Sequence, residues 1–210
     1  MLDATKAETT RVGEAVPDAT LPELAVSLRS PLQGLQLPDV PDVATLRDPG
    51  PLTRFVVRGD DAAVAGLGAW LGVVPPAQIN RAAANGDRIA MKLGPDEWLV
   101  LAEPAAGREL GAPASDKLVL VDVSHRNAGL VLCGPQVEAV LAAGCPLPLN
   151  DQAFPAGRAT RTLFAKAEIV LWRQSATTFH IEVARSFAPY LVAHLAEAID
   201  VEAALAGLGA

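Results

Sequence analysis

The sequence predicts an α+β fold in which two ferredoxin-like halves of βαββ type pack together. Residues 51–123 show strand and helix patterns in the order β-α-β-β-α-β, and residues 124–200 begin a similar order again. The stretch VVRGDDAAVAGLGAWLGVVPP also resembles LVLCGPQVEAVLAAGCPLPL, because each reads as a strand, a glycine, an amphipathic helix and a Gly and Pro stop. We therefore expect one folded domain over residues 51–200.

The first half is predicted from alternating apolar residues and from turn residues. Its predicted elements are, in chain order, a strand at 52–59, a helix at 60–74, strands at Asp87–Leu93 and Trp98–Ala102, a short helix near Ala105–Leu110, and a strand at Lys117–Val123. Asp60 or Asp61 is the expected N-cap of the first helix. The Gly-Pro turn at residues 94–97 joins the two middle strands as a hairpin.

The second half repeats this order and ends in a longer helix. Its predicted elements are a strand ending at Leu130–Cys133, a helix from Gly134 to about Ala143, a hairpin of Arg161–Ala165 and Glu168–Arg173, a strand at Thr178–Ala184, and a helix at 187–199. Ser186 is the expected N-cap of the last helix, where Pro189 falls in the tolerant first turn. One stripe of that helix is expected to hold Phe187, Leu191, His194, Leu195 and Ile199.

Residues 1–50 differ from the rest because prolines interrupt every periodic stretch. These prolines are Pro17, Pro22, Pro31, Pro38, Pro41 and Pro49. Proline fixes φ and removes a donor, so long helices and central strands are not expected here. The segment is still rich in leucine, which predicts an extended N-terminal arm docking on another surface. A tail packed against its own domain is the alternative. Residues 201–210 are expected to form a C-terminal tail.

Composition and charge exclude some classes of function. The net charge is −7 and no cluster of Lys and Arg stands out, so the basic surface of a nucleic-acid binder is missing. The longest uncharged run, Ala62–Asn80, contains Pro75 and Pro76 and has an apolar part shorter than the roughly 20 residues of a spanning helix. We expect no membrane segment. A mean hydropathy of +0.27 instead favours apolar surface that is covered by a partner subunit.

The expected location is cytoplasmic. MLDATKAETT is not basic and has no apolar stretch, so no signal peptide is predicted. Cys133 and Cys145 fit no paired metal-ligand spacing and are expected to be reduced thiols. The three histidines, His125, His180 and His194, share no i, i+3 or i+4 spacing, so no metal site is predicted.

The stretch VDVSHRNAGLVLCG, residues 121–134, contains the residue types of a hydrolase triad in Asp122, Ser124 and His125. Neighbours on a strand point to opposite faces, so Ser124 and His125 would diverge. The frame also lacks the G-x-S-x-G of a nucleophile elbow. Asp122 and Ser124 are better suited to bonding backbone amides where one strand passes to the next. We expect a structural role.

No cofactor loop or P-loop is found. GLGAWLG lies within a helix pattern and lacks the acidic residue that reads a ribose. Four basic residues around the second hairpin, Arg158, Arg161, Lys166 and Arg173, suggest either a contact patch for an acidic partner or ordinary solvated positions, and the second reading is favoured.

Several longer stretches together resemble the gamma subunit of heterotetrameric sarcosine oxidase. They are LGPDEWLVLAEP, VDVSHRNAGLVLCGP, LAAGCPLPLNDQAFPAGRATRTLFAKAEIVLWR and FHIEVARSFAPYLVAHL. The likeness runs in the right order from about Leu93 to Leu195. Pro148 departs from it, because an acidic residue is expected after GCPL. The resemblance implies a fold similar to the folate-binding domain of aminomethyltransferases such as the glycine-cleavage T-protein, where DVSH also looks like a group motif.

The resemblance also implies a function and partners. The holoenzyme of that family demethylates sarcosine oxidatively to glycine, producing H2O2 and either formaldehyde or methylenetetrahydrofolate. Its FAD, FMN, NAD and tetrahydrofolate are expected in the partner subunits and none in this chain. The partners would be the large alpha subunit and the beta and delta subunits. Two alternatives stay open: a free-standing folate-binding aminomethyltransferase-like protein, and a subunit of a related N-methyl amine oxidase.

No residue of this chain is expected to be catalytic or to bind a cofactor or metal. Residues expected to act in structure and contact are Asp122, Ser124, His125 and Arg126 at the strand junction, and Arg185 and Ser186 at the start of the last helix.

Overall fold

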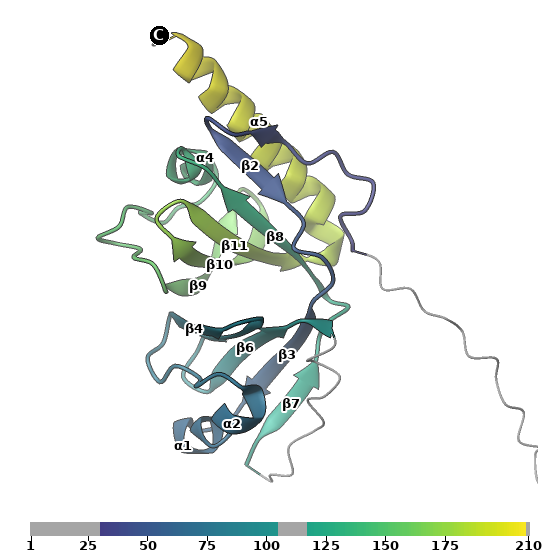
Figure 1. Ribbon diagram of the computed structural model, residues 1–210, viewed down its shortest axis with the longest axis vertical. Helices are drawn as coiled ribbons and strands as arrows, with labels where there is room; N and C mark the ends of the chain where they lie inside the picture. Colours follow the sequence, from purple (N-terminus) through teal and green to yellow (C-terminus); the bar gives the residue numbers. More distant parts are fainter. Residues whose placement is uncertain (1–29, 105–116, 209–210) are drawn as a thin grey trace, which may run out of the picture.

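The computed structural model describes residues 30–104 and 117–208. They form two antiparallel sheets, one for each half of the chain, with helices on the outer side of each (Figure 1). The five-stranded sheet has the order β4-β5-β6-β3-β7, and the six-stranded sheet has the order β1-β2-β8-β11-β10-β9. The predicted α+β class with two packed halves is confirmed.

The first half has the strand order of a ferredoxin-like unit. Its elements are β3 (Thr53–Arg58), α1 (Asp61–Ala65), α2 (Gly68–Leu71), β4 (Arg81–Asn85), β5 (Arg88–Lys92), β6 (Glu97–Ala102) and β7 (Val119–Asp122). The order β5-β6-β3-β7 places the third strand between the first two, as in a split βαβ unit. Asp60 is the N-cap of α1, since its Oδ1 accepts a hydrogen bond of 2.7 Å from the Ala63 amide.

Two first-half predictions need correction. The single helix expected at 60–74 is two short helices, because the chain turns at Gly66 and Leu67 between them. Strand β4 was not predicted, since its sequence RAAAN is alanine-rich and shows no strand alternation. It forms by pairing with β5 through the turn at Gly86, where φ is +56°. The helix expected near Ala105–Leu110 lies outside the described residues.

The second half repeats the arrangement. Its elements are β1 (Asp39–Val40), β2 (Ala44–Arg47), β8 (Asn127–Cys133), α4 (Val137–Ala142), β9 (Ala159–Phe164), β10 (Ala167–Ser175), β11 (Thr178–Ala184), the 3₁₀ turn η1 (Arg185–Phe187) and α5 (Ala188–Leu208). The order β2-β8-β11-β10 matches β7-β3-β6-β5 of the first half, with β9 and β4 as the added edge strands. The fourth strand of this half therefore comes from upstream of the first half.

The expectation of an extended arm is wrong for residues 30–47. Thr45, Leu46 and Arg47 pair with β8, and Leu32, Val43 and Leu46 are buried in the core of the second half. Gly134 permits this approach, because a Cβ there would lie 2.5 Å from the Val43 carbonyl oxygen. The alternative of a tail packed against its own domain holds for this stretch. Residues 1–29 lie outside the description.

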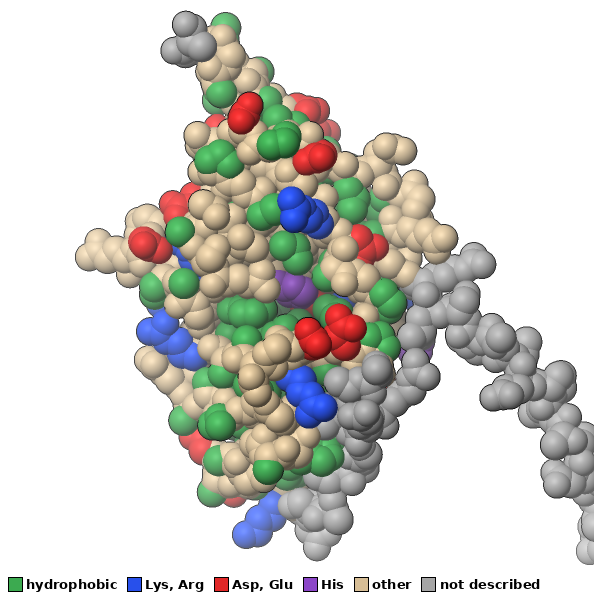
Figure 2. All heavy atoms as spheres, viewed as in Figure 1, with side chains coloured by type: hydrophobic (Ala, Val, Ile, Leu, Met, Phe, Trp, Pro, Cys, Tyr) green, Lys and Arg blue, Asp and Glu red, His purple; other side chains and the backbone are tan. Residues whose placement is uncertain are grey.

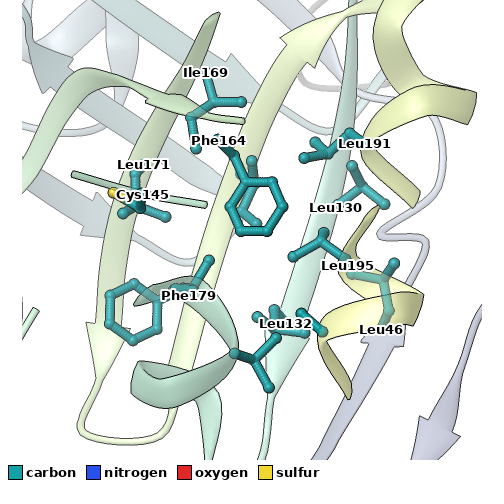
Figure 3. Close-up of a cluster of buried hydrophobic side chains, with 14 of the residues drawn as sticks. Leu46, Leu130, Leu132, Cys145, Phe164, Ile169, Leu171, Phe179, Leu191 and Leu195 are labelled. Atoms are coloured by element: carbon teal, nitrogen blue, oxygen red, sulfur yellow. The ribbon is translucent and has the colours of Figure 1, made fainter. Parts of the chain in front are cut away.

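The core of the second half lies between its sheet and helices α4 and α5. Figure 3 shows leucine, isoleucine and phenylalanine side chains from β2, β8, β10, β11 and α5 converging there. Leu191, Leu195 and Ile199 are buried as expected, but Phe187 and His194 lie on a different stripe and remain partly exposed. The expected C-terminal tail is helical as far as Leu208. None of the helices within 30–104 and 117–208 has the length and apolarity of a membrane span.

The two sheets meet through a smaller apolar cluster. Met91, Leu99 and Leu101 of the first sheet pack against Ala159, Val170 and Trp172 of the second. The edge strands also touch, since Arg81 and Arg158 form an isolated antiparallel bridge. The halves are therefore one packed domain, and the polar groups that lie beside this cluster form the candidate site.

Candidate functional site at the junction of the two halves

The residues that follow β7 are hydrogen-bonded to the backbone of β3. We call this contact, between residues 122–124 and Arg54, the clamp. Asp122 Oδ1 accepts hydrogen bonds from the Ser124 amide (2.8 Å) and the Ser124 hydroxyl (2.6 Å). Ser124 Oγ in turn accepts from the Arg54 amide at 2.9 Å, and the Arg54 carbonyl accepts from the Val123 amide at 2.8 Å. The hydroxyl of Ser124 is thus engaged by Asp122 and the backbone. The geometry agrees with the structural interpretation of this stretch.

The other predicted residues lie beside this clamp. The side chains of His125 and Arg126 are exposed, so His125 faces outward from the junction of the halves. The Arg126 carbonyl accepts a hydrogen bond of 2.9 Å from the Arg185 amide, which ties the junction to the start of the last helix. The structure therefore joins Asp122 and Ser124 through their side chains, and it links Arg126 through backbone bonds to Val123 and Arg185.

Ser186 is not the N-cap of the last helix. The helical turn already begins at Arg185, so Ala184 occupies the N-cap position and Ser186 lies inside η1. No side-chain hydrogen bond caps this turn. The sequence pattern was misleading because a 3₁₀ turn starts the helical segment two residues earlier than the Ser-Phe-Ala-Pro sequence indicates.

We therefore expect Ser186→Ala to change the free energy of unfolding by less than about 0.5 kcal/mol, since an exposed serine without a capping bond contributes little. Urea denaturation followed by circular dichroism measures it. Asp60→Ala is the matched comparison, because Asp60 does cap α1, and its loss should cost about 0.5–2 kcal/mol. An equal loss at both positions would contradict this assignment.

A buried ion pair lies directly behind the clamp. Arg54 on β3 and Glu182 on β11 join the two sheets, with Nε–Oε2 at 2.5 Å and Nη2–Oε1 at 3.0 Å. The side chains are 4% and 0% exposed. His180 Nε2 lies 2.9 Å from Glu182 Oε1, so Arg54 and His180 both interact with the same carboxylate. These three side chains are buried, and the charged side chains that Figure 2 shows at the level where the halves meet belong to the surface.

The groups around Glu182 stabilise its ionised form. Burial alone would raise the pKa of this carboxyl, but the hydrogen bond and charge of His180, together with the Arg54 guanidinium, hold the pKa below its ordinary value. Gly129 on β8 stands opposite Glu182 in the register. A Cβ at that position would lie 2.9 Å from both Arg54 Nη2 and Glu182 Oε1, so only glycine leaves room for the pair.

A second polar contact joins the halves nearer the surface. Glu97 on β6 is mostly buried and bonds to Arg58 of its own half and to Arg161 on β9. The four basic residues of the second hairpin do not share one patch. Arg173 is buried and bonds to backbone carbonyls, Arg158 lies over the Phe154 ring, and Arg161 meets Glu97. The favoured reading of solvated positions is therefore wrong for Arg173.

These contacts support cohesion of the two halves. The Glu182 carboxylate is used on both oxygens by Arg54 and His180, and the Ser124 hydroxyl meets an aspartate and an amide. Among the described residues, no group of three or more His, Cys, Asp or Glu side chains is placed to hold a metal. The arrangement holds the two sheets in place relative to each other.

Comparison with known proteins assigns the chain to a family. The model of the "Sarcosine oxidase, gamma subunit family" matches residues 58–201, well over half of the chain. The chain belongs to the sarcosine oxidase gamma subunit family. Two relatives named sarcosine oxidase subunit gamma are each 32% identical to it. The Arthrobacter sp relative aligns over 65% of this chain and 70% of its own length, and the Corynebacterium sp. (strain U-96) relative over 74% and 79%.

One solved structure agrees with this family membership, and a second shows the same fold. A chain of the heterotetrameric sarcosine oxidase from Corynebacterium sp. U-96, in complex with pyrrole 2-carboxylate, superposes with a TM-score of 0.73 and 30% identity. The match covers 82% of this chain and 94% of that one. Aminomethyltransferase T of the glycine cleavage system from Bartonella henselae shares the fold, with a TM-score of 0.56, 18% identity, and coverage of 80% and 57%.

Sequence reasoning missed Arg54, Glu182, His180 and Gly129. A signal was present, because His180 and Glu182 sit two apart on the apolar strand Thr178–Ala184 and so share a face. A carboxylate within a strand of this kind needs a cation. Which cation it meets depends on the packing of the two halves, and that is not visible in spacing along the chain.

Proposed function

We propose that this chain is the small, non-catalytic gamma subunit of a heterotetrameric sarcosine oxidase and serves its assembly and stability. The complex would demethylate sarcosine oxidatively to glycine, with formation of H2O2 and either formaldehyde or methylenetetrahydrofolate. The observation that carries the proposal is the match over 94% of one chain of a solved heterotetrameric sarcosine oxidase. The mutual neutralisation of the buried charges at the junction fits a structural role for this chain.

The partners and cofactors belong to the same proposal. The chain would associate with alpha, beta and delta subunits in the cytoplasm, and FAD, FMN, NAD and tetrahydrofolate would be carried by those partners. Asp122, Ser124, His125, Arg126, Arg185 and Ser186 would contribute to structure and subunit contact. A role in subunit contact is supported by the exposed side chains of His125, Arg126 and Arg185. A structural role is supported by the hydrogen bonds of Asp122 and Ser124.

Co-expression with a tagged alpha subunit tests the proposal. We expect the chain to co-purify with that subunit and the complete complex to oxidise sarcosine with consumption of oxygen. Omitting this chain should lower the yield of assembled complex. A chain that stays a stable monomer beside the tagged alpha subunit would contradict the assigned role.

The shared fold with aminomethyltransferase T motivates a second measurement. Titration of the isolated chain with tetrahydrofolate, followed by calorimetry, should show no tight binding. Tight binding by the chain alone would favour a free-standing folate-binding protein. Oxygen consumption by the complex with other N-methyl amines distinguishes sarcosine oxidase from a related amine oxidase.

A further inference from the structure

Helix α5 and the turn η1 before it carry two stripes of mostly hydrophobic side chains, and the second stripe is uncovered over its C-terminal part. Ala188, Leu191, Leu195 and Ile199 are buried against the core of the second half. A second stripe follows a different face at intervals of three, four or seven residues, as expected for one side of a helix. It comprises Phe187, Tyr190, His194, Val201, Leu205 and Leu208.

The second stripe is ordered at its start and uncovered at its end. Tyr190 makes edge contacts with the rings of Phe187 (6.1 Å) and His194 (4.3 Å). Beyond these rings, Val201 is 57% exposed, Leu205 56% and Leu208 85%. Three large apolar side chains in a row on one helix face are more than the scattered exposure that a soluble surface normally shows.

The uncovered part stands away from the body of the molecule. Figure 1 shows the C-terminal end of α5 extending past the sheets, and Figure 2 shows hydrophobic and acidic side chains on that projecting end. A groove of about 240 Å³ leads to it, between α5 and the neighbouring turns. Its lining is apolar at Ala143, Gly144, Phe164, Ala165, Ala198 and Val201 and polar at His194, Glu197 and Glu202. The apolar surface therefore continues from the groove along the helix.

The acidic side chains lie beside the exposed end of the stripe. Asp200 and Glu202 flank it there, and Glu197 lies 3.2 Å from His194 Nδ1. The helix α5 itself contains no lysine or arginine over Ala188–Leu208, and the exposed Lys166 lies at the other end of the stripe, where its amide donates to the Tyr190 hydroxyl. The C-terminal end of a helix already carries partial negative charge, which basic residues in the last turn normally offset. Two copies of this surface would repel each other, so a second copy of the chain is disfavoured. A partner with basic side chains is favoured.

We propose that the projecting face of α5 is a docking site for a helical segment of a partner subunit, whose apolar side chains are flanked by Lys or Arg. This inference rests on the proposed function as a subunit of a complex. Phe187, His194, Val201 and Leu208 are spaced seven residues apart, which is the repeat that two helices packed side by side present to each other. The basic flanks of the partner would meet Glu197, Asp200 and Glu202.

The test compares affinities of full-length chains for the remaining subunits of the complex, measured by biolayer interferometry. Val201→Asp with Leu205→Asp should weaken binding at least tenfold, because two charges would be buried in an apolar contact. Val74→Asp is the matched control, since Val74 is 74% exposed in the first half, and it should leave binding unchanged. Both variants should keep the wild-type circular dichroism spectrum, as the replaced side chains lie at the surface.

Charge reversal tests the basic flanks. Asp200→Lys should weaken binding several-fold and reduce its dependence on salt, whereas Asp87→Lys on the turn after β4 should change neither.

Wild-type binding with no effect of the Val201 and Leu205 substitutions would overturn the docking site and leave the proposed function standing. Absence of wild-type binding would overturn both. A dimer of the isolated chain that those substitutions dissociate would overturn it by showing a second copy as the occupant. Loss of their effect after removal of residues 1–29 would instead identify that segment as the occupant.

Discussion

Replacing Glu182 by glutamine is expected to lower the free energy of unfolding by about 3–5 kcal/mol. The substitution keeps the volume of the side chain but removes the charge that balances Arg54, whose side chain is 4% exposed. An uncompensated charge at such a site loses its water without gaining a partner of opposite sign. Urea denaturation followed by tryptophan fluorescence measures the change, since Trp172 lies near His180 at a ring distance of 6.1 Å.

Controls separate the loss of charge pairing from general damage. Glu168→Gln on β10 is the matched control, because Glu168 is exposed, and it should stay within about 0.5 kcal/mol of the wild type. Combining Arg54→Met with Glu182→Leu should recover at least half of the loss, since the guanidinium is removed together with the carboxylate that balances it. If the double variant were less stable than Glu182→Gln, a buried unpaired charge would not be the cause.

The effect of Glu182→Gln on the free energy of unfolding is expected to depend on pH. The pKa of Glu182 in the folded chain is below its ordinary value of 4.5, so the folded state binds the proton less readily than the unfolded state. The stability that Glu182 contributes is therefore fully present above that ordinary value and is lost as the pH falls below it toward the lowered pKa. The difference in unfolding free energy between wild type and Glu182→Gln should therefore shrink as the pH falls below 4.5.

The order of helices and strands could be predicted because each is indicated by the local spacing of its apolar residues. The hairpin of Asp87–Leu93 and Trp98–Ala102 and the strand Thr178–Ala184 are found close to the expected places. Strand β2 was missed, since four residues between prolines carry no pattern of their own. Its place in the sheet depends on contact with β8, nearly ninety residues later in the chain. Local reasoning cannot see a strand that only a distant partner stabilises.

The candidate site was predicted only in its local part. Asp122 and Ser124 were expected to bond nearby amides, and such bonds depend on neighbours in sequence. One of those amides is that of Arg54, far away in the chain, and through it the clamp is continuous with the buried pair. The exposed stripe of α5 was hidden for a similar reason. The sequence shows apolar residues on both faces, and only packing decides which face the core covers.

Replacing Arg173 by alanine should be at least as damaging as Glu182→Gln, with a loss of about 4 kcal/mol or more in the free energy of unfolding. The Arg173 side chain is 2% exposed. Its Nη1 donates to the carbonyls of Leu149 (2.6 Å) and Phe154 (3.0 Å), and its Nη2 donates to the carbonyl of Ala176 (2.9 Å) and to Glu138 (2.7 Å). Removing it leaves buried carbonyls without donors.

The comparison with Arg173→Lys shows what the guanidinium contributes beyond charge. Lysine keeps the positive charge but cannot reach carbonyls on both sides with one ammonium group, so it should recover less than half of the loss. Exposed Arg47→Ala should change stability by no more than about 0.5 kcal/mol. Because the carbonyls of Leu149 and Phe154 belong to the segment between α4 and β9, that segment should also become sensitive to limited proteolysis in the alanine variant. Full recovery by lysine would mean that charge, and not the planar set of donors, holds this segment in place.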